Sequence, residues 1–218
     1  MQKLLAEFLG TLILALAVVG SGTMAQILTQ DVGLQLLINA SVTAGVLWLI
    51  ITLFSGVSGA HFNPVVSAIA SYRKELSFSE FIYFAVAQTV GAIGGTILAN
   101  ALFTRETLQL SSFTRTGWNL WLSEVVATTG LVFLIFHLVA IKKEKKIPAA
   151  VAAWIFGAYF FTSSTSFANP AISLGRIFTE SFAGIAPESA IVFIPFQLLG
   201  AVIGYLIYIS FNKKVVTK

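Results

Sequence analysis

The sequence predicts an all-α membrane protein with six transmembrane helices and two re-entrant half-helices, arranged as an inverted repeat. Three observations lead to this prediction. The 218-residue chain is 57% hydrophobic and 10% charged, with a mean hydropathy of +0.89. Two Asn-Pro pairs, at residues 63–64 and 169–170, begin apolar stretches that are too short to cross a bilayer. Several short motifs also occur once in each half of the chain, in the same order.

The composition excludes several classes of protein. A soluble domain carries about 25% charged residues, far more than this chain has. There is no cysteine, so disulfides and thiolate chemistry are excluded, and the two histidines lie 76 residues apart. No Ser-His-Asp set, metal-ligand spacing or phosphate-binding loop is found. We therefore expect no enzyme activity, no metal and no cofactor. Because the basic residues lie in short loops, we expect no nucleic-acid partner.

Six stretches of the chain are apolar enough to be membrane spans, which need about 20 mostly apolar residues. They are residues 4–27, 34–55, 79–103, 118–140, 148–163 and 189–211. The fifth is short, although its start at Pro148 is clear. The two further stretches, 63–72 and 169–179, begin with Asn-Pro and are typical of re-entrant segments.

The basic residues predict the orientation in the membrane. Of the 13 Lys and Arg residues, ten lie at the termini and in the second-to-third and fourth-to-fifth connections of the spans. These ten are Lys3, Arg73, Lys74, Lys142, Lys143, Lys145, Lys146, Lys213, Lys214 and Lys218, against Arg105, Arg115 and Arg176 on the other side. Positive charge is enriched in cytoplasmic loops. We therefore expect a multi-pass cell-membrane protein with both termini in the cytoplasm.

The repeated motifs predict two halves, about 1–104 and 118–218, within a single transmembrane channel domain spanning 1–218. "AEFLGT" (6–11) pairs with "SEVVAT" (123–128), "HFNPVVS" (61–67) with "FANPAIS" (167–173), and "QTVGAIGG" (88–95) with "QLLGAVIG" (197–204). Each half has three spans, an odd number, so the halves must be inverted in the membrane. Inverted repeats with broken helices are typical of transport folds.

Each Asn-Pro pair combines a good N-cap residue with a proline at the first helical position. Inverted symmetry should bring the two helix starts together at the middle of the membrane. Their positive dipole ends, about half a charge each, would then face one another and repel cations. We expect the amides of Asn63 and Asn169 to remain free to donate to a passing solute.

These motifs, with "SGAHFNPVVS" at 58–67, resemble those of the major intrinsic protein family, the aquaporins and aquaglyceroporins. The resemblance implies a right-handed six-helix bundle, one pore per chain and a homotetramer. The pore motifs would be Asn63, Pro64 and Val65, and Asn169, Pro170 and Ala171. Because Val65 replaces the usual alanine, we expect a small change in packing at the pore centre.

The resemblance also implies a four-residue constriction near the extracellular side. Counting from the Asn-Pro motifs without gaps places it at Thr43, Gly157, Ser166 and Ile172. Water-selective members carry an aromatic residue, His, a small residue and Arg at these positions. Glycerol-type members carry an aromatic residue, Gly, an aromatic residue and Arg. This chain matches neither pattern, and its small, neutral residues predict a wide constriction.

The sequence therefore predicts a passive channel for small uncharged solutes in the lipid bilayer, excluding protons and ions. Candidate solutes are glycerol, urea, ammonia and neutral metalloid acids, together with water. The alternatives are a water-selective aquaporin, a secondary transporter, and a non-conducting membrane scaffold.

Three further features leave alternatives open. Arg176 is one helical turn beyond Ile172, and could face the pore vestibule or bind headgroups or loop carbonyls. Glu7 and Glu124 lie inside spans, where they could relay protons or, as their symmetry favours, accept backbone N–H groups of the re-entrant loops. Two pairs of glycines could allow close helix crossing between the halves, which is the favoured interpretation, or contribute to tetramer contacts. These are Gly91 with Gly95, and Gly200 with Gly204.

Overall fold

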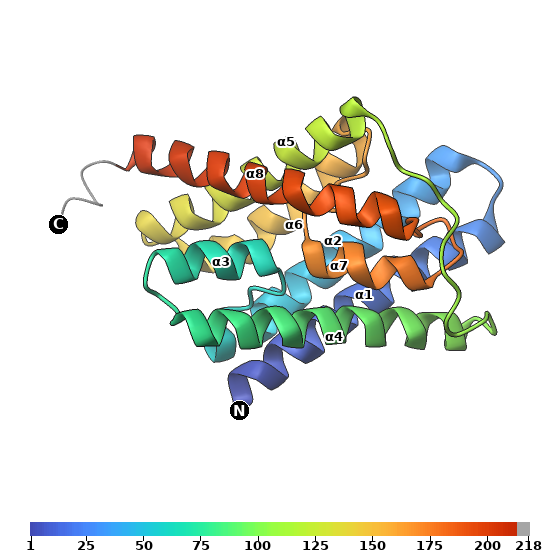
Figure 1. Cartoon of the computed structure of the whole chain (residues 1–218), viewed down its shortest axis with the longest axis horizontal. Coiled ribbons are helices and arrows are strands. Elements are labelled where there is room, and N and C mark those ends of the chain that lie inside the picture. The colour runs from blue at the N-terminus through green and yellow to red at the C-terminus, as the bar shows by residue number, and fades with distance from the viewer. Residues whose placement is uncertain (213–218) are drawn as a thin grey trace.

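The computed structural model describes residues 1–212 as a bundle of helices joined by short connections (Figure 1). The helices are α1 (Gln2–Leu28), α2 (Val32–Ser58), α3 (Pro64–Tyr72), α4 (Phe78–Leu102), α5 (Trp118–Ala140), η1 (Glu144–Lys146), α6 (Ile147–Phe161), α7 (Pro170–Gly175), η2 (Arg176–Phe178) and α8 (Pro187–Phe211). Each predicted span or half-helix corresponds to one of these α-helices. Three of the basic residues expected on the cytoplasmic side, Lys213, Lys214 and Lys218, lie outside the described residues.

Local capping fixes where several of these helices begin. The Asp31 side chain accepts a hydrogen bond from the backbone N–H of Leu34, at the start of α2. Ser77 and Glu80 form a reciprocal capping box at the start of α4. Asn63 and Asn169 cap α3 and α7 in the same way, each followed by a proline at the first helical position. The helix starts are therefore set by residues next to them in the sequence.

Five helices (α1, α2, α4, α5 and α8) are long and apolar enough to cross a membrane. The sixth span, α6, has 15 residues and is shorter than the usual length of about 20. After α6 the chain turns into the middle of the bundle, where Ser164, Phe167 and Ala168 are buried. Protein therefore surrounds the irregular backbone of this segment, as membrane depth requires. This arrangement confirms the predicted fold of six membrane helices and two half-helices.

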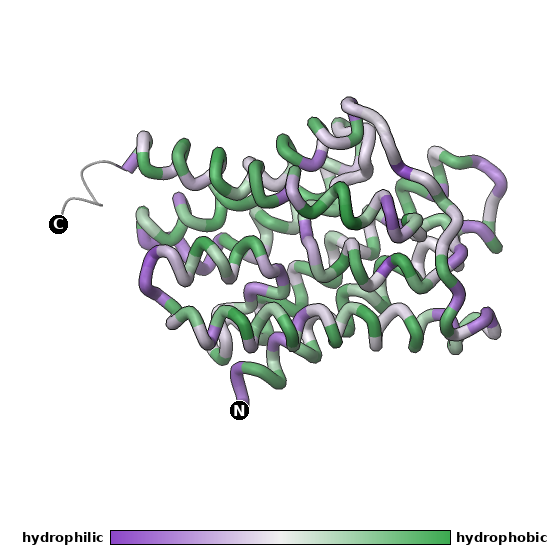
Figure 2. The backbone as a smooth tube through the Cα atoms, viewed as in Figure 1, coloured by the Kyte–Doolittle hydropathy of each residue, from purple (hydrophilic) through white to green (hydrophobic). Residues whose placement is uncertain are grey.

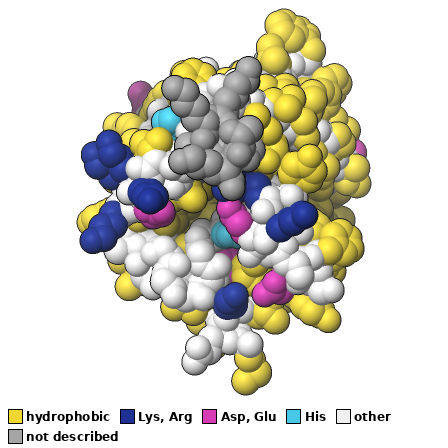
Figure 3. Space-filling model, turned by 90° about the vertical axis from the view of Figure 1, so that its left-hand side faces the viewer, with side chains coloured by type: hydrophobic (Ala, Val, Ile, Leu, Met, Phe, Trp, Pro, Cys, Tyr) yellow, Lys and Arg dark blue, Asp and Glu magenta, His cyan; other side chains and the backbone are white. Residues whose placement is uncertain are grey.

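Hydrophilic residues gather at the two ends of the bundle, while the helices are mostly hydrophobic along their lengths (Figure 2). α1 begins and α8 ends at the same end of the bundle, where the α3–α4 and α5–α6 connections also lie (Figure 1). Figure 3 views that end and shows Lys and Arg side chains distributed over it, next to acidic ones. The described basic residues that were expected on one side thus belong to segments at one end of the molecule (Figure 1).

The two halves of the chain use the same internal packing. α1 packs against α4 in the first half, and α5 packs against α8 in the second. The four repeated glycines lie at these crossings, where an added Cβ would come within 2.1–2.6 Å of a carbonyl oxygen of the neighbouring helix. These glycines are Gly91, Gly95, Gly200 and Gly204. The expectation that they join the two halves is wrong, because each pair closes a helix crossing within its own half.

Candidate pore

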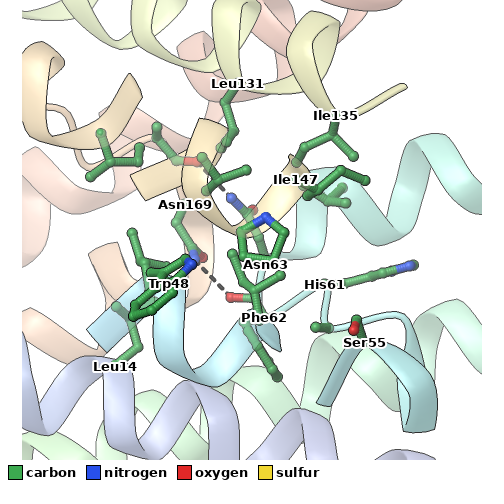
Figure 4. A pocket seen from close by; sticks show the side chains of 18 of the residues that line it. Leu14, Trp48, Ser55, His61, Phe62, Asn63, Leu131, Ile135, Ile147 and Asn169 are labelled. Carbon is green, nitrogen blue, oxygen red and sulfur yellow. Dashed lines mark hydrogen bonds between the residues drawn. The ribbon is translucent and has the colours of Figure 1, made fainter. Parts of the chain in front are cut away.

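The two half-helices, α3 and α7, lie in line through the middle of the bundle and meet at their N-terminal ends (Figure 1). The side-chain Nδ2 of Asn63 donates to the carbonyl oxygen of Ala168 at 2.8 Å, and that of Asn169 donates to the carbonyl of Phe62 at 2.8 Å (Figure 4). Each asparagine therefore caps its own helix with Oδ1 and holds the opposite loop with Nδ2.

The expectation of free asparagine amides needs a correction. A primary amide carries two N–H groups, and in each asparagine one of them is used to bind the opposite loop. Both Asn63 and Asn169 also line the central cavity. One N–H group of each amide is therefore left to donate to a solute, and the cross-loop bond fixes its direction.

The loops before the half-helices have a strained backbone that repeats between the halves. Ala60 and Phe62 have φ angles of 53° and 48°, and Ser166 and Ala168 have φ angles of 53° and 47°. A left-handed conformation costs a non-glycine residue about 1–2 kcal/mol. These residues stand one and three positions before Asn63 and Asn169. The surrounding structure must compensate for the same strain twice.

Glu7 and Glu124 provide that compensation, and both side chains are completely buried. Each carboxylate accepts hydrogen bonds from two successive loop N–H groups, a serine hydroxyl and a glutamine side chain. The donors are Ser58, His61, Phe62 and Gln88 for Glu7, and Ser164, Phe167, Ala168 and Gln197 for Glu124, at 2.5–3.0 Å. Neither carboxylate lines the cavity. This geometry supports the structural interpretation of the two acids over a proton relay.

A cavity of about 720 Å³ passes both asparagines. Glu75, Glu144 and Lys145 line it on one side of them, and Arg176 lines it on the other. Part of its wall is apolar, and much of the polar part comes from the two re-entrant loops. The apolar residues include Leu14, Val18, Leu47, Ile51, Leu131, Ile135, Val151 and Ile155. A solute in this cavity would therefore meet both polar groups and apolar side chains.

Three of the four residues expected at the constriction line the cavity, namely Thr43, Ser166 and Ile172. Gly157 does not, and a Cβ added to it would face the Phe161 ring at 3.4 Å.

Tyr159 lines the cavity in place of Gly157, as the last of a row that recurs every four residues on α6 after Val151 and Ile155. Its hydroxyl lies 3.2 Å from the hydroxyl of Thr43. Counting back from Asn169 without gaps failed because the number of residues between α6 and the Asn-Pro motif was assumed. The four-residue row on α6 was the available signal for Tyr159.

Arg176 combines two of the alternatives that the sequence left open. Its side chain is 2% exposed and lines the cavity, and its Nε donates to the carbonyl oxygen of Ala183. The guanidinium carbon lies 3.5 Å from the centroid of the Phe167 ring. Arg176 thus binds a loop carbonyl and faces the vestibule at the same time.

Comparison with known proteins agrees with this architecture. The model of the major intrinsic protein family matches residues 1–166. The chain belongs to the major intrinsic protein family. Members of this family are membrane channels, and this protein is accordingly a multi-pass passive channel for water or small solutes.

Relatives in the family include the aquaglyceroporin AqpS of Rhizobium meliloti, which is 44% identical over 201 residues, covering 92% of this chain and 86% of the relative. Aquaporin TIP1-2 of Musa acuminata is 28% identical, with 94% and 84% covered. The X-ray structure of the aquaglyceroporin from Plasmodium falciparum has a TM-score of 0.74, covers 100% of this chain and 99% of its own, and is 19% identical. That structural likeness shows the fold alone.

Proposed function

We propose that this channel conducts small uncharged solutes, namely glycerol, urea, ammonia and neutral metalloid acids, together with water. The observation that carries the proposal is the set Thr43, Tyr159, Ser166 and Ile172 lining the cavity. Three of these side chains bear a hydroxyl group and the fourth is aliphatic. The Ser166 hydroxyl is buried and has no hydrogen-bond partner among the described residues, and it would need a small rotation to reach a solute in the cavity. Pore width and the lining donors and acceptors determine selectivity.

The same cavity is unfavourable for ions and protons. Its apolar wall cannot replace the hydration shell of an ion, and an ion stripped of water without compensation is very unstable. At the centre, the N-terminal ends of α3 and α7 and the free amide N–H groups of Asn63 and Asn169 present positive potential. A hydrated proton is a cation and would be repelled there.

We further propose a homotetramer in the cell membrane, with one pore in each single-domain chain of two inverted halves. The basic end of the bundle would face the cytoplasm, by the positive-inside rule. The Arg176 end of the cavity would then face outward. Crosslinking in native membranes followed by mass determination tests the tetramer. Protease access to the Lys142–Lys146 connection in oriented vesicles tests the orientation.

Stopped-flow light scattering on proteoliposomes tests the proposed solute range. The protein should accelerate the flux of water, glycerol, urea and arsenous acid over protein-free vesicles. Acceleration of water alone would instead favour the water-selective alternative. Accumulation against a gradient driven by protons would favour a transporter, and no acceleration of any flux would favour a scaffold. Because the chain has no cysteine, thiol-directed mercurials should not block the flux.

A further inference from the structure

Two arginines meet at the Arg176 end of the cavity, around one aromatic ring. The guanidinium carbons of Arg115 and Arg176 lie 5.3 Å and 3.5 Å from the centroid of the Phe167 ring. Both arginines also bind one short stretch of backbone. Arg115 donates to the carbonyls of Phe182 at 3.1 Å and Gly184 at 2.9 Å, and Arg176 donates to the carbonyl between them, that of Ala183. Two cations are therefore held next to each other.

Among the described residues, no carboxylate lies within ion-pair distance of this pair. Over residues 1–212, the ion pairs within 4.0 Å are Lys3 with Glu80 and Arg73 with Glu75, and neither includes Arg115 or Arg176. The buried acid of this half, Glu124, already accepts four hydrogen bonds from its loop and from Gln197. Burying charges without an opposite charge is unfavourable. The pair thus has no carboxylate in direct contact with it.

The guanidinium of Arg176 also has unused donors. It carries five N–H groups, and of these only the Nε–H has a hydrogen-bond partner among the described residues. The side chain is 2% exposed and yet lines the cavity. The Nη groups have no partner among the described residues, but they keep some accessible surface. They are therefore open to the cavity, next to the hydroxyl-lined region at Ser166.

We propose that this end of the cavity binds a small monovalent carboxylate, such as formate or acetate, as the counter-ion of the pair. The planar fork of Arg176 would hold it through two parallel N–H···O bonds, the geometry in which arginine recognises carboxylates. Arg115 would add positive charge without touching the ligand. A bound carboxylate would lie in the path of neutral solutes, next to Ser166 and Ile172. External carboxylate would then slow solute flux through the pore.

Binding can be measured without any flux. Purified protein in detergent is titrated calorimetrically with sodium formate, using sodium chloride at the same ionic strength as the blank. Saturable formate binding is expected, and Arg176→Gln should weaken it at least tenfold. Arg105→Gln is the matched control, because Arg105 lies outside the cavity and binds the Glu180 carbonyl at 2.7 Å. It should bind like the wild type.

Two results from the formate titrations of the wild type and Arg176→Gln would overturn the binding proposal. One is the absence of saturable formate heat in folded wild-type protein, and the other is unchanged affinity in Arg176→Gln. If Arg176→Gln fails to fold, Arg176→Lys serves in its place, since it keeps the charge but loses the fork. Its affinity should still fall, and unchanged affinity would contradict the role assigned to the guanidinium. Binding with chloride as strong as with formate would also contradict recognition of a carboxylate.

The position in the solute path needs a second measurement, which depends on the proposed function. Glycerol flux into proteoliposomes is followed with equal formate on both faces, so that no formic acid gradient exists. Formate should slow glycerol in the wild type and in Arg105→Gln, but not in Arg176→Gln. Formate that binds without slowing glycerol would place the site outside the path. A protein that binds formate but conducts no glycerol would refute the proposed function and leave the binding site standing.

Discussion

The two re-entrant loops, residues 58–67 and 164–173, share the same hydrogen-bonding pattern but differ in the side chains next to it. In both, a buried glutamate accepts two loop N–H groups, and an asparagine caps a half-helix and binds the other loop. They differ two positions before the asparagine, where one has His61 and the other Phe167. His61 Nδ1 lies 3.0 Å from the hydroxyl of Ser67, on its own half-helix. Phe167 instead packs beneath two arginines.

This difference distinguishes the residues that hold the loops in place from those that set the chemical character of the cavity. The residues that repeat hold the strained backbone and place the amides at the centre, and they do so equally in both halves. The residues that do not repeat give the cavity its two different ends. Glu75, Glu144 and Lys145 line one end and Arg176 lines the other. An inverted repeat therefore produces a symmetrical centre, and side chains outside the repeat make the pore asymmetrical along its axis.

The largest effect should come from removing one of the two buried carboxylates that hold the loops, Glu7 or Glu124. Glu124→Leu leaves four buried donors without an acceptor, and Glu7→Leu does the same in the other half. Each should lower the free energy of unfolding by about 3–5 kcal/mol, measured by thermal unfolding in detergent. Glu188→Gln, at an exposed helix start, is the control. A large effect in only one half would refute the equivalence of the two loops.

The next largest effect concerns the helix crossings. Gly95→Ala and Gly204→Ala place a Cβ 2.1 Å and 2.4 Å from a carbonyl of the partner helix. Overpacking of this kind should destabilise each variant by about 1–3 kcal/mol, again measured by thermal unfolding. Gly45→Ala and Gly56→Ala have no neighbour within 4 Å and should be neutral or slightly stabilising. If all four variants had the same stability, close packing at the two helix crossings would not determine the stability of the fold.

A third change sharpens the difference between the two ends. Ile172→Arg adds a guanidinium at the hydroxyl-lined level and should narrow the pore. Glycerol and arsenous acid flux should fall several-fold, and water flux should fall less, in stopped-flow assays. Ile172→Val keeps the neutral character and should change the fluxes little. Solute flux that stays equal or rises in Ile172→Arg would count against the proposed constriction.

The smallest effect should come from making the loops more alike. His61→Phe copies the residue of the other loop and loses the interaction with Ser67. Because Glu7 still holds the loop backbone, the loss should be about 1 kcal/mol, the usual worth of one hydrogen bond. Thermal unfolding measures it, with Ser67→Ala as the comparison. Collapse of the fold in His61→Phe would show that the side chain, and not the carboxylate, holds this loop.

The sequence singled out Asn63, Asn169, Glu7 and Glu124 because they recur in both halves with the same neighbours, and in the structure all four bind the re-entrant loops. It failed where helix rotation mattered. Gly157 and Tyr159 are two residues apart on α6, and only one of them can face the cavity. Which one does so depends on how α6 packs against its neighbours, including α2 and α5. A count along the chain carries no information about that rotation.

By itself the sequence determined the membrane fold, the helix starts and the inverted repeat. These follow from local physics, since apolar length decides what spans a bilayer and Asn-Pro decides where a helix can begin. Only the tertiary structure decided that one amide N–H of each asparagine is used to join the loops, that the glycine crossings lie within each half, and that Arg115 and Arg176 share Phe167. Those arrangements bring together residues distant in the chain, and the packing of the whole bundle sets their distances.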